Sequence, residues 1–280
     1  MRDLNRYSAG DSLPAAPAVA GFKELRDGLF REFYCAQPSP DLARFLAGHR
    51  HLQGGTFMVT IAFEQAWLIG HFLDHLARHM PGVPVIVADN SRTGSGSREI
   101  AAACLAGGGS YLKLPSNPIR NINRSHGNAL NWVWRNIVRP LQPRVFGFLD
   151  HDIFPLAPVD VDALLGEQDF YGQKMDKGRG WAVWAGYSFY RFAALADRRL
   201  DFNPDMDRRL VAGGRNYGPL YRHYDPATLR FAKREFRAFE DPALGSVVTE
   251  RIDGWVHFGG VSYQEQKMRS RKYLESLIAA

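Results

Sequence analysis

Cysteine is scarce in this chain of 280 residues, which contains only Cys35 and Cys104. Two isolated cysteines provide neither a disulfide framework nor the paired spacing of a zinc site. We therefore expect no fold held together by disulfides and no thiolate metal centre. Nothing in the cysteine content favours export from the cell.

Long apolar runs are also missing. No stretch reaches the about 18 apolar residues that indicate a transmembrane helix. Residues 1–20 are rich in Ala, Pro, Ser and Gly and contain no apolar stretch typical of a signal peptide, so we expect a loose arm there. The expected location is cytoplasmic, with peripheral contact to a membrane left open. Internal repeats and nucleic-acid-binding motifs are absent, so nucleic acid is not an expected partner.

The composition suits a globular protein that binds an anion. Hydrophobic residues make up 45% of the chain, which is ordinary for a domain with a real core. The formal net charge is +6, and this charge favours an anionic partner such as a nucleotide or a phospholipid surface. The length is typical of one large domain or two small ones.

Apolar strands alternate with helical segments between residues 57 and 150, after a helical pattern over 21–48. This alternation predicts a mostly parallel sheet with helical crossovers. Ligands of such sheets bind at the carboxyl ends of the strands. The expected strands are 57–63, 83–88, 111–114 and 146–150, and the expected helices are 64–80, 98–106 and 126–138.

Two carboxylates follow the apolar run Phe146–Leu149. Asp150 and Asp152 are spaced i, i+2, so in an extended segment they point to the same side. Paired carboxylates of this kind hold Mg²⁺ or Mn²⁺, with phosphate oxygens completing the coordination. A strand-end turn capped by these aspartates is the structural alternative. Glu64 and Asp89 also follow predicted strands, although Asp89–Ser91 would equally suit an Asx-turn.

Four motifs occur in an order that resembles the nucleotide-binding half of a family 2 type glycosyltransferase with the GT-A fold. The segments are Thr60–Glu64, Val85–Ser91, His126–Asn131 and Phe148–Asp152, and a weaker match extends to about Ser262. The resemblance implies a GT-A-like central sheet flanked by helices over residues 56–280. Residues 56–155 would form the nucleotide-binding half and 156–280 the acceptor half, while 1–55 would form an N-terminal arm and helical extension.

The resemblance also implies a metal-dependent transfer of a sugar from a nucleotide-diphosphate sugar to an acceptor hydroxyl, with inversion. The metal would be Mn²⁺ or Mg²⁺, and the acceptor a saccharide or a lipid-linked saccharide. His257, in a His-x-Gly-Gly-x-Ser stretch, would join Asp150 and Asp152 as a metal ligand, although a lone histidine after an apolar run is usually a core residue. The residues expected at the donor are Glu64, Asp89, Asn90, His126, Gly127 and Asp150.

The second half would form the acceptor side, where aromatic faces suit sugar rings and lipid tails. Trp181, Trp184 and Tyr187 are the acceptor candidates, and Trp181 and Trp184 point to opposite faces of an extended run. By resemblance, an acid at a helix start serves as general base, with Asp207 favoured over Asp205 and Asp241. A basic, partly aromatic surface over 230–239 and the tail 263–280 could contact anionic lipid or a lipid-phosphate acceptor, although a solvated helix face is the simpler interpretation.

Two other functions are compatible with these features. A sugar nucleotidyltransferase-like enzyme would use a similar aspartate pair, but it usually has a Gly-rich basic loop after the first strand, and Ala62–Gln65 is not one. A non-catalytic module that binds an anionic polymer is suggested by charge alone. Replacing Asp150 and Asp152 in such a module would leave binding intact or strengthen it.

Overall fold

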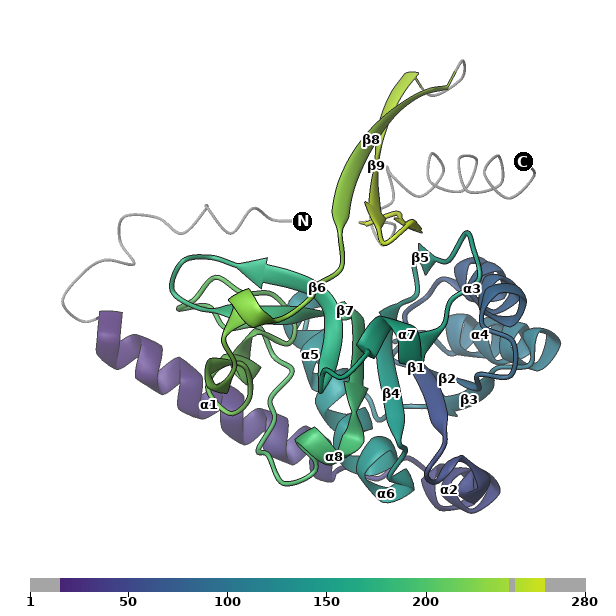
Figure 1. Cartoon of the computed structure of the whole chain (residues 1–280). Coiled ribbons are helices and arrows are strands. Elements are labelled where there is room, and N and C mark those ends of the chain that lie inside the picture. The colour runs from purple at the N-terminus through teal and green to yellow at the C-terminus, as the bar shows by residue number, and fades with distance from the viewer. Residues whose placement is uncertain (1–15, 242–244, 260–280) are drawn as a thin grey trace.

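The computed structural model describes residues 16–241 and 245–259 of the chain. Its centre is a six-stranded sheet in the order β3-β2-β1-β4-β7-β6 (Figure 1). The four strands β3, β2, β1 and β4 are parallel, whereas β7 is antiparallel to β4 and β6 is antiparallel to β7. The six strands are β1 (Thr56–Ala62), β2 (Val85–Asp89), β3 (Ser110–Lys113), β4 (Val145–Asp150), β6 (Phe170–Asp176) and β7 (Trp181–Arg191).

Helices cover both faces of this sheet, which confirms the predicted α/β class with a mostly parallel sheet. α3 and α4 pack on one face and α5 on the other, with α1 packed against α5. The main helices are α1 (Ala16–Ala36), α2 (Leu42–Gly48), α3 (Ala66–His79), α4 (Gly94–Gly107) and α5 (Ile122–Val133). Shorter helices are π-helical Trp134–Val138, α6 (Arg139–Leu141), α7 (Val161–Leu165) and α8 (Phe192–Leu195).

The sequence of β4 shows why the sheet is buried on both sides. Its side chains alternate between two apolar clusters, with Phe146 and Phe148 in the cluster under α5 and Val145 and Leu149 in the cluster under α3. A strand buried on both faces needs a continuous apolar run, which is what this segment provides. The run ends at Asp150, where the strand reaches the edge of the core.

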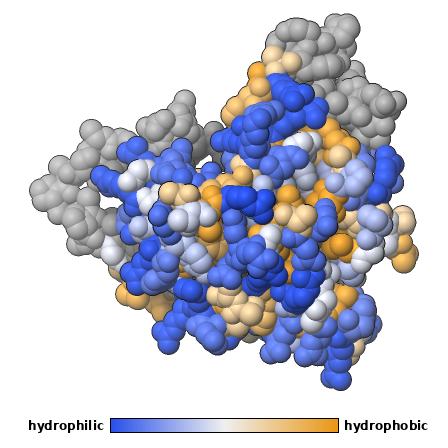
Figure 2. All heavy atoms as spheres, in the orientation of Figure 1, coloured by the Kyte–Doolittle hydropathy of each residue, from blue (hydrophilic) through white to orange (hydrophobic). Residues whose placement is uncertain are grey.

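A second sheet, in the order β5-β10-β9-β8, stands beside the first. Its longest strands form a hairpin that projects from the body of the molecule in Figure 1. On the face drawn in Figure 2, hydrophobic residues appear at the surface of this hairpin, and its described side chains include the exposed Phe236 and Val248. The strands are β5 (Ile153–Phe154), β8 (Arg234–Asp241), β9 (Gly245–Ile252) and β10 (Trp255–His257).

The extension before β1 is attached to the central core. Tyr34 is fully buried, and its hydroxyl donates to the carbonyl of Pro115 at 3.3 Å. Arg31 pairs with Asp201, which ties α1 to the loop after α8. The opposite side of α1 exposes Phe22, Leu25, Leu29 and Phe33.

Two predicted helix starts were wrong. The helix expected from 98 begins at Gly94, because Thr93 caps α4 by accepting a hydrogen bond from the amide of Gly96 at 3.1 Å. α5 begins at Ile122 instead of 126, capped by Asn121.

In the described part of the chain, no helix is both long enough and apolar enough to cross a membrane. Residues 1–15 of the expected arm and the basic tail 263–280 lie outside the described residues, whereas residues 16–20 of that arm belong to α1.

Candidate metal and donor site

The candidate site lies at the carboxyl ends of β1 and β4. These neighbouring strands run parallel, with Ile61 opposite Asp150. Along the sheet, β1, β2 and β3 follow one another in one direction, whereas β4 lies on the other side of β1. The strand order therefore reverses between β1 and β4, and such a reversal opens a crevice for ligands at the strand ends.

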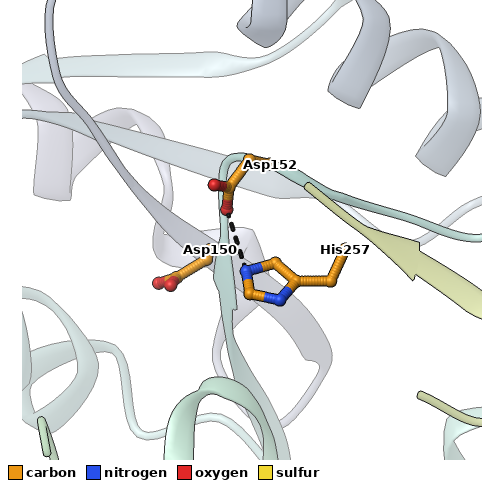
Figure 3. Close-up of side chains that lie close together, drawn as sticks. All are labelled: Asp150, Asp152 and His257. Carbon is orange, nitrogen blue, oxygen red and sulfur yellow. Dashed lines mark ion pairs between the residues drawn. The ribbon is translucent and has the colours of Figure 1, made fainter. Parts of the chain in front are cut away.

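Asp150, Asp152 and His257 meet near these strand ends (Figure 3). One ligand atom of each lies within 4.8 Å of the others. Asp150 ends β4, and a tight turn leads through Asp152 into β5. β10 then pairs antiparallel with β5, which places His257 opposite Ile153 and beside Asp152. The backbone amide of Phe258 donates to the carbonyl of Asp152 at 3.0 Å. This bond links the residue before β5 to the residue after β10.

Asp152 and His257 form a close electrostatic contact. The Nε2 atom of His257 lies 3.5 Å from a carboxylate oxygen of Asp152, and both side chains are nearly buried. Burial opposes the charge on Asp152, but the neighbouring His257 lowers the pKa of Asp152 to about 2. Burial likewise opposes the imidazolium, yet Asp152 and Glu250 raise the pKa of His257 to about 10. Each partner thus favours the charged form of the other.

The three residues fit a hard divalent cation. Two carboxylates and one imidazole are ligands that Mn²⁺ and Mg²⁺ accept, with the imidazole favouring Mn²⁺. The Oδ1 atom of Asp150 is buried and has no hydrogen-bond partner, which is costly unless a ligand compensates it. His126 lies 3.4 Å from this oxygen, but burial lowers the pKa of His126, so the imidazole is neutral at pH 7 and forms no ion pair.

Glu250 is a site residue that the sequence analysis did not single out. Its Oε2 lies 2.6 Å from Nδ1 of His257, on the side of the ring away from Asp152. Glu250 and His257 are direct partners across β9 and β10. A register between two strands is not readable from sequence, so no local signal marks this contact.

The candidate carboxylates at the ends of β1 and β2 accept hydrogen bonds from within the protein. Asp89 is fully buried, and it accepts hydrogen bonds from the amide of Ser91 at 2.8 Å and the hydroxyl of Tyr111 at 2.9 Å. The structure therefore contains the Asx-turn that was the alternative for Asp89. The carboxylate of Glu64 accepts from the amides of Arg92 and Thr93 just before α4. The side chain of Asn90 donates to Ser125, but its Oδ1 is buried without a partner.

His126 and Gly127 do not open a helix, contrary to the helix expected over 126–138. α5 begins at Ile122, so both residues lie beyond the first turn, and only the first four amides of a helix lack internal acceptors. His126 nevertheless faces the site through its side chain, 3.4 Å from Asp150. Gly127 instead allows close packing, because an added Cβ would lie 2.6 Å from Oδ1 of Asn203.

The resemblance implied that the general base lies at the start of a helix. Neither Asp205 nor Asp207 lies at such a position. Asp205 and Asp207 lie in a loop and turn closed by a bridge between Asp205 and Leu210. Asp205 is buried and accepts from the amide and guanidinium of Arg208, whereas Asp207 is exposed. Asp241 ends β8, and its side chain lies outside the described part.

The two tryptophans of β7 point to opposite faces, as expected. Trp184 lies at the site, with its ring 4.9 Å from the ring of His257. Trp181 is buried in the other cluster, against Tyr221. Tyr187 is fully buried and donates to Asp253 at 3.2 Å. Of the three acceptor candidates, Trp184 therefore lies beside a candidate metal ligand, His257.

No protein-family model matches the chain, and no curated protein matches it. Several solved structures resemble part of it. The structure of TarS residues 1–349 from S. aureus has 16% sequence identity and a TM-score of 0.38, covering 55% of this chain and 53% of TarS. The mannosyltransferase PcManGT from Pyrobaculum calidifontis, solved with GDP-Man and Mn²⁺, has 12% identity and a TM-score of 0.39, covering 64% and 54%.

Glucosyl-3-phosphoglycerate synthase from Mycobacterium tuberculosis, solved with phosphoglyceric acid, has 18% identity and a TM-score of 0.35, covering 57% of this chain and 64% of the synthase. The chain spans less than two thirds of the length of each of these proteins. Its function is therefore inferred from its own site residues.

Proposed function

We propose that this chain is a glycosyltransferase that moves a sugar from a nucleotide-diphosphate sugar to an acceptor hydroxyl. The observation that carries the proposal is the meeting of Asp150, Asp152 and His257 at the strand-order reversal, with one buried carboxylate oxygen left unpaired. A divalent cation bound there would neutralise charge on the departing nucleoside diphosphate. The sequence motifs that resemble family 2 glycosyltransferases support the same chemistry.

The protein residues have separate roles in this proposal. Asp150, Asp152 and His257 hold the cation, and Trp184 offers an aromatic surface beside His257 for the acceptor. The acceptor oxygen attacks the anomeric carbon as the bond from that carbon to the diphosphate oxygen breaks. A carboxylate accepts the hydroxyl proton as general base. Asp207 is proposed for this role because its side chain is exposed, whereas the carboxylate of Asp205 is bound to Arg208. Inversion at the anomeric carbon is proposed from the resemblance alone.

The donor site is tested by thermal stability in the presence of UDP, GDP, dTDP, CDP and ADP, each with and without Mn²⁺. A ligand that binds only the folded state stabilises it by about 2.7 kcal/mol at a hundred times its Kd. One diphosphate should raise the melting temperature only when Mn²⁺ is present. Asp152→Asn and His257→Ala should abolish this shift, because each removes a proposed ligand.

Asp176→Asn is the matched control, since Asp176 is half exposed and pairs with Lys174 at a distance of 3.2 Å. This variant should keep the full shift. If no diphosphate stabilises the protein with or without Mn²⁺, the proposed donor site is wrong. Product analysis by NMR with the identified donor then tests inversion, and Asp207→Asn should reduce turnover while leaving the diphosphate-dependent shift unchanged.

A further inference from the structure

The second sheet contains a row of side chains that runs from the candidate metal site into the projecting hairpin. Phe236 of β8 lies opposite Glu250 of β9, and Glu250 lies opposite His257 of β10. Directly opposed residues of antiparallel strands point to the same face, with neighbouring strands about 4.8 Å apart. Glu250 is therefore the hairpin residue placed to contact the imidazole of His257.

Both carboxylate oxygens of Glu250 have a partner. Oε2 lies 2.6 Å from Nδ1 of His257, and Oε1 accepts from Nε of Arg234. The Arg234 guanidinium also lies 4.7 Å from the centre of the Phe236 ring. Glu250 and His257 expose only 14% and 11% of their side chains, so water does not compete freely for this contact. The carboxylate is thus held in one orientation from two sides.

This contact decides which nitrogen of His257 faces the site. The χ2 torsion of histidine is broad and roughly two-fold, so an unsupported ring can turn over and exchange its nitrogens. With Nδ1 held by Glu250, Nε2 points to Asp152 at 3.5 Å and towards Asp150. Histidines that bind metals commonly donate their second N–H to a carboxylate, which fixes the ring and makes it a better ligand.

We infer that Glu250, supported by Arg234, is a positioning residue that presents Nε2 of His257 to a divalent cation held with Asp150 and Asp152. This inference rests on the metal site of the proposed function. It makes the projecting hairpin part of that site, because β8 and β9 supply Arg234 and Glu250. An ion pair that merely fastens the hairpin is the competing explanation, and it predicts no effect on metal binding.

The test is Mn²⁺ affinity, measured by titration with electron paramagnetic resonance on the full chain without substrates. Removing a carboxylate partner of a metal-bound histidine typically costs 10–100-fold in affinity, and we expect about that loss in Glu250→Ala. Glu250→Gln should lose less, because its amide oxygen can still accept from Nδ1–H. Arg234→Ala should show a smaller loss than Glu250→Ala, since it acts through Glu250.

Glu235→Ala is the matched control. Glu235 belongs to the same strand as Arg234 and pairs with Lys233 and with Arg237 at 3.4 Å, but as the neighbour of Phe236 it points to the opposite face. Its Mn²⁺ affinity should stay within about twofold of wild type. If folded Glu250→Ala binds Mn²⁺ as tightly as wild type, the positioning role is wrong. Equal losses in Glu250→Gln and Glu250→Ala would also overturn it.

A metal-free readout separates this inference from the proposed function. In protein with ¹⁵N-labelled histidine, NMR should show a hydrogen-bonded proton on Nδ1 of His257 that Glu250→Ala removes and Glu235→Ala preserves. Wild-type protein that shows this signal but binds no Mn²⁺ would contradict the metal site, and with it the role of Glu250. Protein that binds Mn²⁺ without the signal would contradict the role of Glu250 alone.

Discussion

At the scale of single residues, acids with similar positions in the sequence have different roles in the structure. Asp150 and Asp89 both end parallel strands at the same edge of the sheet. Asp150 keeps one buried oxygen without a hydrogen-bond partner, whereas Asp89 is fully buried and hydrogen-bonded. The unsatisfied oxygen is consistent with the proposed metal ligand, whereas the hydrogen bonds of Asp89 favour a structural role for that carboxylate.

Asp89→Asn tests the structural role of that carboxylate. Burial disfavours its charge, but hydrogen bonds from Ser91 and the nearby Lys113 ammonium leave the pKa of Asp89 below its ordinary value. A lowered pKa in the folded state stabilises the protein above the unfolded-state pKa of about 4, and this stabilisation is lost as the pH falls through the folded-state pKa. The substitution should therefore lower the free energy of unfolding by about 2 kcal/mol at pH 7, and by progressively less below pH 4.

Urea unfolding of both proteins between pH 7 and pH 3 measures this difference. Asp74→Asn is the control, because Asp74 is exposed and forms only a helix-surface pair with Arg78. Its effect should stay within about 0.5 kcal/mol at pH 7. If Asp89→Asn is as stable as wild type at pH 7 but weakens nucleotide binding, Asp89 is a ligand-binding residue instead.

At the scale of elements, Gly127 of α5 was expected at the donor, but its surroundings are those of a residue in close packing. Gly127 faces the loop after α8, where an added Cβ would lie 2.6 Å from Oδ1 of Asn203 and 2.9 Å from the carbonyl oxygen of Phe202. The same helix bonds to this loop through Asn128 and Asn131. Close contact between helix and loop therefore accounts for the glycine.

Gly127→Ala should destabilise the protein by about 1–3 kcal/mol, because the new methyl group has to displace backbone as well as a side chain. Gly70→Ala is the control within α3, where an added Cβ meets nothing within 4 Å and alanine favours the helix. The control should be neutral or up to about 1 kcal/mol more stable than wild type. Urea unfolding measures both variants, and equal stabilities would show that α5 and the loop can separate at little cost.

At the scale of the whole molecule, the helical extension shares the core of the sheet. Tyr34 is completely buried in the same apolar cluster as Phe146 and Trp132, while its neighbour Phe33 is 64% exposed. The extension and the sheet should therefore unfold together in one transition. This arrangement links α1 to α5, which carries His126 beside the candidate metal site.

Tyr34→Ala should lower the stability of the entire domain by about 3–5 kcal/mol, the usual cost of deleting a large buried aromatic side chain. Phe33→Ala, one residue away on the exposed side, should change it by about 0.5 kcal/mol or less. Calorimetry should show one transition in each case. A separate early transition in Tyr34→Ala, with the remainder melting as in wild type, would mean that α1 unfolds independently.

The sequence by itself determined the four parallel strands of the sheet and two members of the candidate site, while His257 entered only through the family resemblance. Continuous apolar runs define strands that are buried on both faces, and the i, i+2 spacing of Asp150 and Asp152 directs both carboxylates to one edge. These features are local, so their pattern is visible in the residues themselves. The helix starts were less certain, because capping by Thr93 and Asn121 shifted α4 and α5 to begin four residues before the predicted positions.

Only the tertiary structure decided what completes the site. His257 reaches Asp152 because β10 pairs with β5, and Glu250 reaches His257 because β9 pairs with β10. Strand register depends on contacts between residues distant along the chain, and shifting it by one residue would turn each of these side chains to the other face. The same long-range packing buried Trp181 and Tyr187 and left Trp184 beside the site. Local residue patterns predict where strands form, and their pairing determines which side chains meet.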